Sequence, residues 1–222
     1  MVILRLKTGE QMYNFCRKVI NFLICRLKIN YLFCMVMTQT ELIEHLTATF
    51  GKTKVNKLKA ILTEQGFALR DLIDLTFYPD KTIAFRAAWL LENLILSNPL
   101  ACLTEIDYLL TQFTKVIYPS CQRHYAKIIM HLTSPKNNLL IKEQLQNINL
   151  EPIVEKCFDW MIDSKVLIAV KVFSAEALFN LRQRYPWITE ELANQLQFLM
   201  NNGSAAIQSR GKKLLKALKA DD

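Results

Sequence analysis

Three side chains near the middle of the chain have the types and spacing that could hold a metal ion. In a helix, Cys121, His124 and His131 would lie on one face, and thiolate sulfur and imidazole nitrogen are zinc ligands. A zinc site needs a fourth ligand and a closer pair, whereas Ile128 interrupts this set. We therefore predict that these residues are packed or polar side chains and that the protein binds no metal.

A second motif could bind phosphate. The residues Phe50-Gly51-Lys52-Thr53 match the end of a phosphate-binding loop, but that loop needs another glycine where this chain has Leu46. We interpret the motif as a helix terminus. The sequence also lacks the glycine pair of a dinucleotide-binding fingerprint and the Gly-x-Ser-x-Gly motif of a serine nucleophile. We predict no catalytic residue and no cofactor.

The elements that must position any site are helices. The chain has 222 residues, of which 51% are hydrophobic, with 5 glycines and 6 prolines. Average usage would give about 26 glycines and prolines together, so the deficit excludes collagen-like and turn-dense β architectures. The hydrophobic content excludes intrinsic disorder. From Thr40 onward apolar residues recur at helical spacing, and the prolines lie near the starts of the predicted helices.

The ends of the first predicted helices are marked by short signals. Thr38-Gln39-Thr40-Glu41 predicts a helix start, with a threonine cap and an acidic first turn. Gly51 and Gly66 predict the ends of two successive helices.

Four later helices share one pattern, in which a small residue is followed by paired aliphatic residues and a closing leucine. The closing leucines are Leu94, Leu132, Leu181 and Leu218. Their middle interval is longer than the other two, which indicates an insertion around 134–150. Each of these second helices follows another apolar helix, predicted at 67–77, 100–117, 151–162 and 187–201. One such pair cannot bury both of its faces, whereas stacked pairs can.

The second helices resemble those of the HEAT-repeat superfamily, through a basic residue that precedes a small one. Arg86-Ala87 and Arg210-Gly211 match this motif, Lys171-Val172 is looser, and the second unit offers Arg123-His124-Tyr125. The resemblance covers about residues 67–220. It implies an all-α fold, a right-handed α-solenoid of about four HEAT-like helix pairs with an N-terminal helical cap. It also implies that the second helices line the concave surface.

Charge is distributed unevenly between the two kinds of helix. Basic residues outnumber acidic ones in the second helices, and acidic residues outnumber basic ones in the first helices. A basic concave surface would attract an acidic partner, either protein or nucleic acid. The candidate binding residues on this surface are Arg86, Arg123, Lys127, Lys171, Arg210 and Lys213. The alternative is a merely solvated face, since Lys and Arg are favoured at helix C-termini, as Arg182 and Arg184 are before Pro186.

These observations predict a non-enzymatic helical-repeat scaffold that binds a macromolecule, with a protein as the favoured partner. The alternative is a nucleic-acid-binding protein, because the chain also resembles the HEAT-like DNA glycosylases of the alkylation-repair family. Those enzymes hold damaged DNA in a basic concavity with Trp, Asp and Arg, and this chain has Asp159, Trp160 and Arg86. The three do not match that family's order or spacing, so no catalytic role is implied. We interpret Trp89 and Trp160 as core residues.

Residues 1–36 differ from the rest of the chain. They carry six basic residues, one acidic residue and three of the six cysteines. Arg26 and Lys28 interrupt the apolar stretches, which excludes a secretion signal and a transmembrane helix there. Three interpretations stay open: an extra amphipathic helix, a membrane-surface anchor, or a segment upstream of a start at Met35 or Met37. We expect residues 1–36 to be dispensable for the fold and 37–222 to form a single helical-repeat domain.

The cysteines bear on the compartment. No Cys-x-x-Cys pair occurs, and Cys102 and Cys157 lie in apolar helices, as small buried hydrophobic residues do. Together with the missing secretion signal, this predicts a reducing cytoplasmic location. The sequence indicates no oligomeric state.

Overall fold

The structure is a computed structural model, and it describes residues 37–48, 52–201 and 203–220. Residues 1–36, and with them the interpretations offered for that segment, lie outside the described residues, as does Gly51. The described helices are α2 (Gln39–Ala48), α3 (Lys52–Gln65), α4 (Leu69–Leu75), α5 (Lys81–Ser97), the 3₁₀ helix η1 (Pro99–Glu105), α6 (Ile106–Phe113), α7 (Pro119–Leu132), α8 (Leu139–Gln146), α9 (Glu151–Ile162), α10 (Ile168–Leu181), α11 (Ile188–Met200) and α12 (Ala205–Leu218). None of the helices among these residues is long and apolar enough to cross a membrane.

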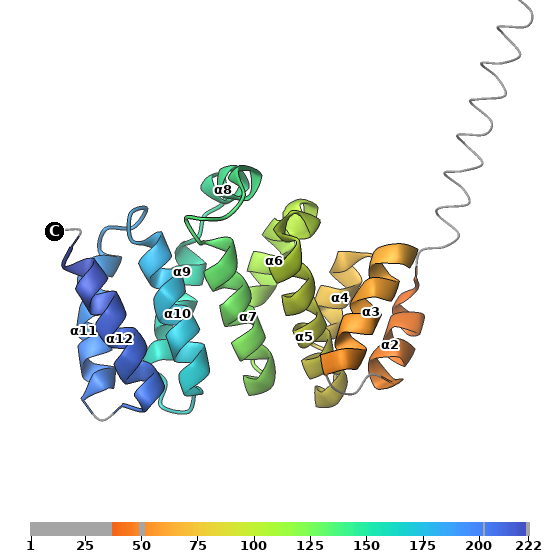
Figure 1. Cartoon of the computed structure of the whole chain (residues 1–222), viewed down its shortest axis with the longest axis horizontal. Helices are drawn as coiled ribbons and strands as arrows, with labels where there is room; N and C mark the ends of the chain where they lie inside the picture. Colours follow the sequence, from red (N-terminus) through yellow and green to blue (C-terminus); the bar gives the residue numbers. More distant parts are fainter. Residues whose placement is uncertain (1–36, 49–51, 202, 221–222) are drawn as a thin grey trace, which may run out of the picture.

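The helices form two layers (Figure 1). In the nearer layer α5 packs against α7, α7 against α10, and α10 against α12, and we call these four helices the second-helix layer. Helices α4, α6, α9 and α11 lie behind them, while α2 and α3 pack against α4 and α5 at the N-terminal end. The described chain is thus an all-helical array of stacked pairs, consistent with the predicted α-solenoid.

Local signals set the predicted helix ends. At the start of α2, the N–H and hydroxyl of Thr38 donate to the Glu41 carboxylate, each at 2.8 Å, and the Glu41 N–H donates back at 3.3 Å. These bonds lower the pKa of Glu41. At the end of α3, Gly66 has a φ of 76°, which favours glycine. Pro119 and Pro152 lie in the first turns of α7 and α9, where a missing N–H is harmless.

Two segments differ from the sequence-based prediction. The helix predicted at 100–117 is divided into η1 and α6, and the 3₁₀ helix begins at Pro99. The insertion around 134–150 contains α8, which packs against η1. The Asn138 side chain accepts a hydrogen bond from the Leu140 N–H and so caps the start of α8.

The core runs between the two layers, and alanines of the second helices are buried in it. Ala88 on α5 and Ala126 on α7 are fully buried. We expect Ala88→Leu or Ala126→Leu to lower the free energy of unfolding by about 1–3 kcal/mol, because the added carbons overpack the core around each alanine. Urea unfolding of each variant measures the change. Ala206→Leu on α12 is the control, since Ala206 is exposed and should have little effect.

Candidate binding surface

The six candidate residues all lie on the second-helix layer, but four of them make hydrogen bonds or ion pairs to other parts of the fold. Arg86 is one: its guanidinium donates to the carbonyls of Leu46 and Thr47, at 2.9 and 2.8 Å. These carbonyls belong to the last turn of α2, where the helix has no backbone N–H groups left to donate to them. Arg86 therefore joins α5 to the end of α2.

Lys171 makes a similar bond from a buried position. Its side chain is on α10, the residue is 4% exposed, and its ammonium donates to the Met161 carbonyl at 3.0 Å. Burial lowers the pKa of Lys171. The sequence-based expectation of a surface cation at this position is corrected, because the ammonium caps the end of α9 and does not face solvent.

A buried ionic cluster joins α5 to α7. Glu92 is 6% exposed, and its two carboxylate oxygens lie 2.6 Å from Nδ1 of His124 and 2.5 Å from Nζ of Lys127. Burial alone would raise the pKa of Glu92, but the hydrogen bonds from His124 and Lys127 outweigh it and lower that pKa. Lys127, the third candidate, is thus held by a carboxylate of the neighbouring helix.

The other two junctions of the layer are also bridged. Between α10 and α12, Arg210 pairs with Glu176 at 2.6 Å. Between α7 and α10, the Asn180 side chain donates to the Met130 carbonyl at 3.1 Å. Glu92 and Glu176 are the acidic residues of α5, α7, α10 and α12, so both carboxylates of the layer are occupied by a neighbouring helix.

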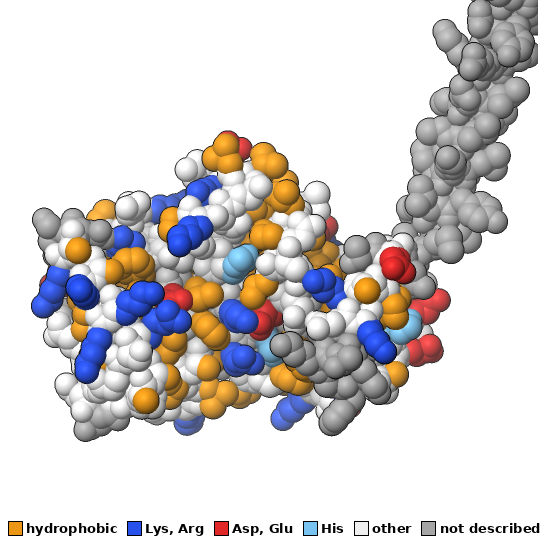
Figure 2. Space-filling view, in the orientation of Figure 1, with side chains coloured by type: hydrophobic (Ala, Val, Ile, Leu, Met, Phe, Trp, Pro, Cys, Tyr) orange, Lys and Arg blue, Asp and Glu red, His pale blue; other side chains and the backbone are white. Residues whose placement is uncertain are grey.

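The remaining cations of this layer face solvent. Arg123 on α7 and Lys213 on α12 are exposed, as are Lys212 and Lys216. Figure 2 shows Lys and Arg side chains on this face over α12 and α7, with Asp or Glu side chains visible between them. Of the six candidates, Arg123 and Lys213 are therefore the two that the fold leaves exposed without an ion pair among the described residues.

A cavity of about 410 Å³ opens between α7, α10 and α12. Its cations are Lys136, Arg210 and Lys213, of which Arg210 pairs with Glu176, also a lining residue. Its apolar lining includes Met130, Phe179 and Leu214, and we call this cavity the basic groove. Apolar and cationic groups therefore lie side by side in it. Such a groove can bury an apolar side chain while it binds an anionic group.

His131 and Lys136 belong to this groove although sequence reasoning did not place them in it. Burial, and to a smaller degree Lys127, lowers the pKa of His131, so its ring is neutral at neutral pH. Lys136 lies in the turn after α7, outside the repeated helices. The repeat pattern cannot identify such a residue. The one sequence feature that could is the basic charge of Lys136 near the start of the insertion.

The residues first considered for metal binding have separate surroundings. The Cys121 thiol donates to the Thr76 carbonyl at 3.7 Å, His124 contacts Glu92, and His131 lines the basic groove. In the described ranges, no three His, Cys, Asp or Glu residues are arranged to hold a metal ion.

The remaining cysteines and tryptophans can also be placed. Cys102 and Cys157 are buried, as predicted, and burial raises the pKa of Cys102 to about 11. Trp160 is confirmed as a core residue: it is 2% exposed and its ring meets that of Phe113 edge-on, with centroids 4.8 Å apart. Trp89 is half-buried against the core. The Trp160 ring therefore offers no exposed face to a nucleic-acid base.

Comparison with known proteins agrees with this architecture. A family model described as a HEAT repeat domain matches residues 42–218, from α2 to the end of α12. No curated protein and no solved structure matches the chain. The match covers most of the chain and the same stacked helices that form the two layers. The protein therefore belongs to the HEAT repeat family.

Proposed function

We propose that this HEAT-repeat protein is a non-catalytic scaffold that binds an acidic protein segment on its second-helix layer. The proposal rests on which charged side chains of this layer are paired and which are exposed. Both carboxylates of the layer, Glu92 and Glu176, are held in ion pairs between helices, while Arg123 and Lys213 remain exposed. The uncompensated charge that faces solvent on these helices is therefore positive, and it attracts an anionic partner.

The basic groove favours a protein as this partner. Lys136 and Lys213 can bind carboxylates, while Met130 and Phe179 offer an apolar floor for one side chain of the same segment. A nucleic-acid backbone would bind the cations but gains little from an apolar floor. An acidic peptide with an apolar residue uses both features.

Charge reversal tests the proposal. In the variant Arg123→Glu/Lys213→Glu we expect about tenfold weaker binding or more, since two attractive charges become repulsive. Partners are cross-linked to the full chain, identified by mass spectrometry, and then titrated with the wild type and the variant across a salt series. The matched control is Lys115→Glu/Lys165→Glu, which makes the same charge change at exposed positions outside the four helices.

Two results would contradict the proposal. One is equal loss of binding in the control variant, which would assign the effect to net charge alone. The other is tight binding to a short duplex DNA with a steep loss of affinity as salt rises, abolished by Arg123→Glu/Lys213→Glu. That result would support the nucleic-acid alternative in place of a protein partner.

A further inference from the structure

Large apolar side chains project from α9 and α11, on the side of the array away from the second-helix layer. Ile162 is 66% exposed and Phe198 is 70% exposed. Trp187, at the N-terminal end of α11, is 45% exposed, and its ring stacks on that of Phe158 with centroids 5.6 Å apart. We call these four residues the outer apolar face.

Contacts between α9 and α11 bring these residues together. Phe158 and Ile162 are one turn apart on α9, so they share a face of that helix. The Gln195 side chain on α11 donates to the Met161 carbonyl at 3.4 Å, which places this turn of α11 beside the end of α9. Phe198 follows one turn after Gln195. The outer apolar face is therefore shared by two helices that contact each other.

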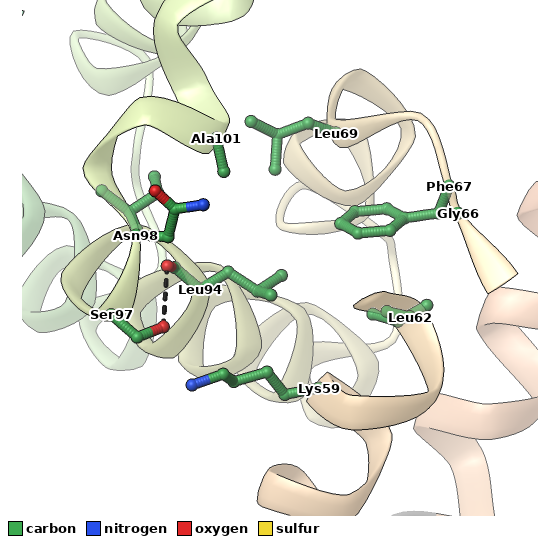
Figure 3. Close-up of a pocket in the computed structure, with 10 residues that line it drawn as sticks. Lys59, Leu62, Gly66, Phe67, Leu69, Leu94, Ser97, Asn98 and Ala101 are labelled. Atoms are coloured by element: carbon green, nitrogen blue, oxygen red, sulfur yellow. Dashed lines mark hydrogen bonds between the residues drawn. The ribbon is translucent and has the colours of Figure 1, made fainter. Parts of the chain in front are cut away.

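Apolar side chains at the N-terminal end of the array are arranged differently. Leu62 and Leu94 are buried, and together with Phe67 and Leu69 they line a cavity of about 480 Å³ between α3, α5 and η1 (Figure 3). The outer apolar face is instead open to solvent. Single exposed apolar residues are ordinary on protein surfaces, whereas a group of them in one place is typical of an interaction surface.

The charged residues around the outer apolar face are mainly acidic. Helices α9 and α11 carry five exposed acidic residues, Glu151, Glu155, Asp159, Glu190 and Glu191. None of the five makes an ion pair with a described residue. Lys156 is the one basic residue of these two helices, and its ammonium lies 5.9 Å from the centroid of the Trp160 ring. The turn after α9 adds one charge of each sign, Asp163 and Lys165.

We propose that the outer apolar face binds a basic amphipathic helix of a partner protein. The apolar side of that helix would pack on Ile162, Trp187 and Phe198. Its Lys or Arg side chains would pair with Glu155 and Asp159, which lie one turn apart on the exposed side of α9.

The acidic residues also distinguish this occupant from two others. A symmetric contact between two copies of the chain would bring the same acidic residues of α9 and α11 together, and like charges repel. An anionic lipid surface would be repelled for the same reason. A basic helix with an apolar side matches both the charge and the apolar character of the surface.

This proposal does not rest on the acidic partner proposed above. Helices α9 and α11 lie behind the second-helix layer (Figure 1), and the outer apolar face shares no residue with the basic groove. The two surfaces attract partners of opposite charge, so a single chain would join a basic helix to an acidic segment.

The experiment starts from an unbiased peptide library. Random 16-residue peptides displayed on phage are selected on the immobilised full chain. We expect the enriched peptides to include a class that is net positive and has apolar residues three and four positions apart. A synthetic peptide of this class is then titrated by fluorescence anisotropy, and circular dichroism should show that it becomes helical on binding.

A first pair of variants tests the apolar contact. Ile162→Ser/Phe198→Ser should weaken binding of the basic peptide about tenfold or more, because its apolar side loses two contacts. The matched apolar control is Leu139→Ser/Leu140→Ser, which removes two exposed apolar side chains from α8 and should bind the peptide as the wild type does. A cooperative thermal melt shows that each variant folds.

A second pair of variants tests the charge. Glu155→Gln/Asp159→Asn should weaken binding about three- to tenfold at low salt, and the salt dependence of the affinity should become less steep. The matched charge control is Glu44→Gln/Glu143→Gln, which neutralises two exposed acidic residues on α2 and α8 and should change the affinity little.

Three outcomes would overturn the proposal. The first is a selection that enriches no basic peptide, or only acidic peptides whose binding Arg123→Glu/Lys213→Glu abolishes; the latter result supports the acidic partner alone. The second is a control variant that weakens binding of the basic peptide as much as its matched test variant does. The third is self-association of the full chain in sedimentation that Ile162→Ser/Phe198→Ser abolishes, which would identify a second copy as the occupant.

Discussion

Glu92→Ala is expected to lower the free energy of unfolding by about 3 kcal/mol, because it removes the buried carboxylate that the His124 and Lys127 side chains both contact. Glu92 holds both His124 and Lys127, and the His124 side chain is almost completely buried. After the substitution, Nδ1 of His124 loses its partner, and Nε2 already has none among the described residues. Lys127 is half-buried and can turn toward solvent, which limits the loss. Chemical denaturation at neutral pH measures the effect.

The contribution of Glu92 to the free energy of unfolding depends on pH. The pKa of Glu92 is lowered in the folded protein, so its contribution to stability is complete above the ordinary carboxyl pKa. That contribution is lost as the pH falls through the lowered pKa. The difference between wild type and Glu92→Ala should therefore shrink in acid.

Glu176→Ala is the matched control for this effect. Glu176 pairs with an Arg210 side chain that is 40% exposed, and an exposed ion pair contributes about 1 kcal/mol or less. Equal destabilisation by the two substitutions would contradict the importance of burial at Glu92. A pH-independent loss for Glu92→Ala would contradict the ionic account.

Tyr125→Ala is expected to be at least as damaging, with a loss of about 3–5 kcal/mol. Tyr125 is fully buried on α7 and is among the largest such side chains. Its hydroxyl lies 2.7 Å from the Thr76 hydroxyl, and its ring centroid lies 6.3 Å from that of Phe77. The substitution would leave a cavity where α7 meets the end of α4. Urea unfolding or a thermal melt measures the loss.

Tyr125→Phe separates the ring from the hydroxyl. The Thr76 hydroxyl is within 2.7 Å of the Ile73 carbonyl and donates to it, so the Tyr125 hydroxyl is the donor to Thr76. Removing that donor should lower the free energy of unfolding by about 1 kcal/mol, far less than the loss of the ring. A loss for Tyr125→Phe as large as that for Tyr125→Ala would show that the hydrogen bond, and not packing, dominates at this position.

Much of the fold could be predicted from local signals. The helix predicted at 151–162 has the bounds observed for α9, because Pro152 lies in its first turn and apolar residues repeat through it. Helix α8 was predicted only as an insertion, since it is short and interrupts the repeat interval. Its signals were the Asn138 cap and the spacing of Ile141 and Leu145, both of which are buried.

The candidate site could be predicted only in part, because periodicity places a residue on a helix but not beside a given neighbour. Arg86 was correctly assigned to a second helix, yet its hydrogen bonds go to carbonyls about 40 residues earlier in the chain. Lys171 follows the repeat motif, and only the packed structure shows that its ammonium is buried. Nothing in the sequence around Glu92 indicates that its carboxylate contacts two residues of the next repeat.

The basic groove spans two helix junctions, α7–α10 and α10–α12, and this has a mechanical consequence. A stack of repeats bends by adding small rotations at each junction. Any bend that carries α12 toward α7 brings Lys213 closer to Lys136 and narrows the groove, and the opposite bend widens it. A segment seated between these helices would act as a wedge, so the stiffness of the C-terminal half of the array would depend on what it holds.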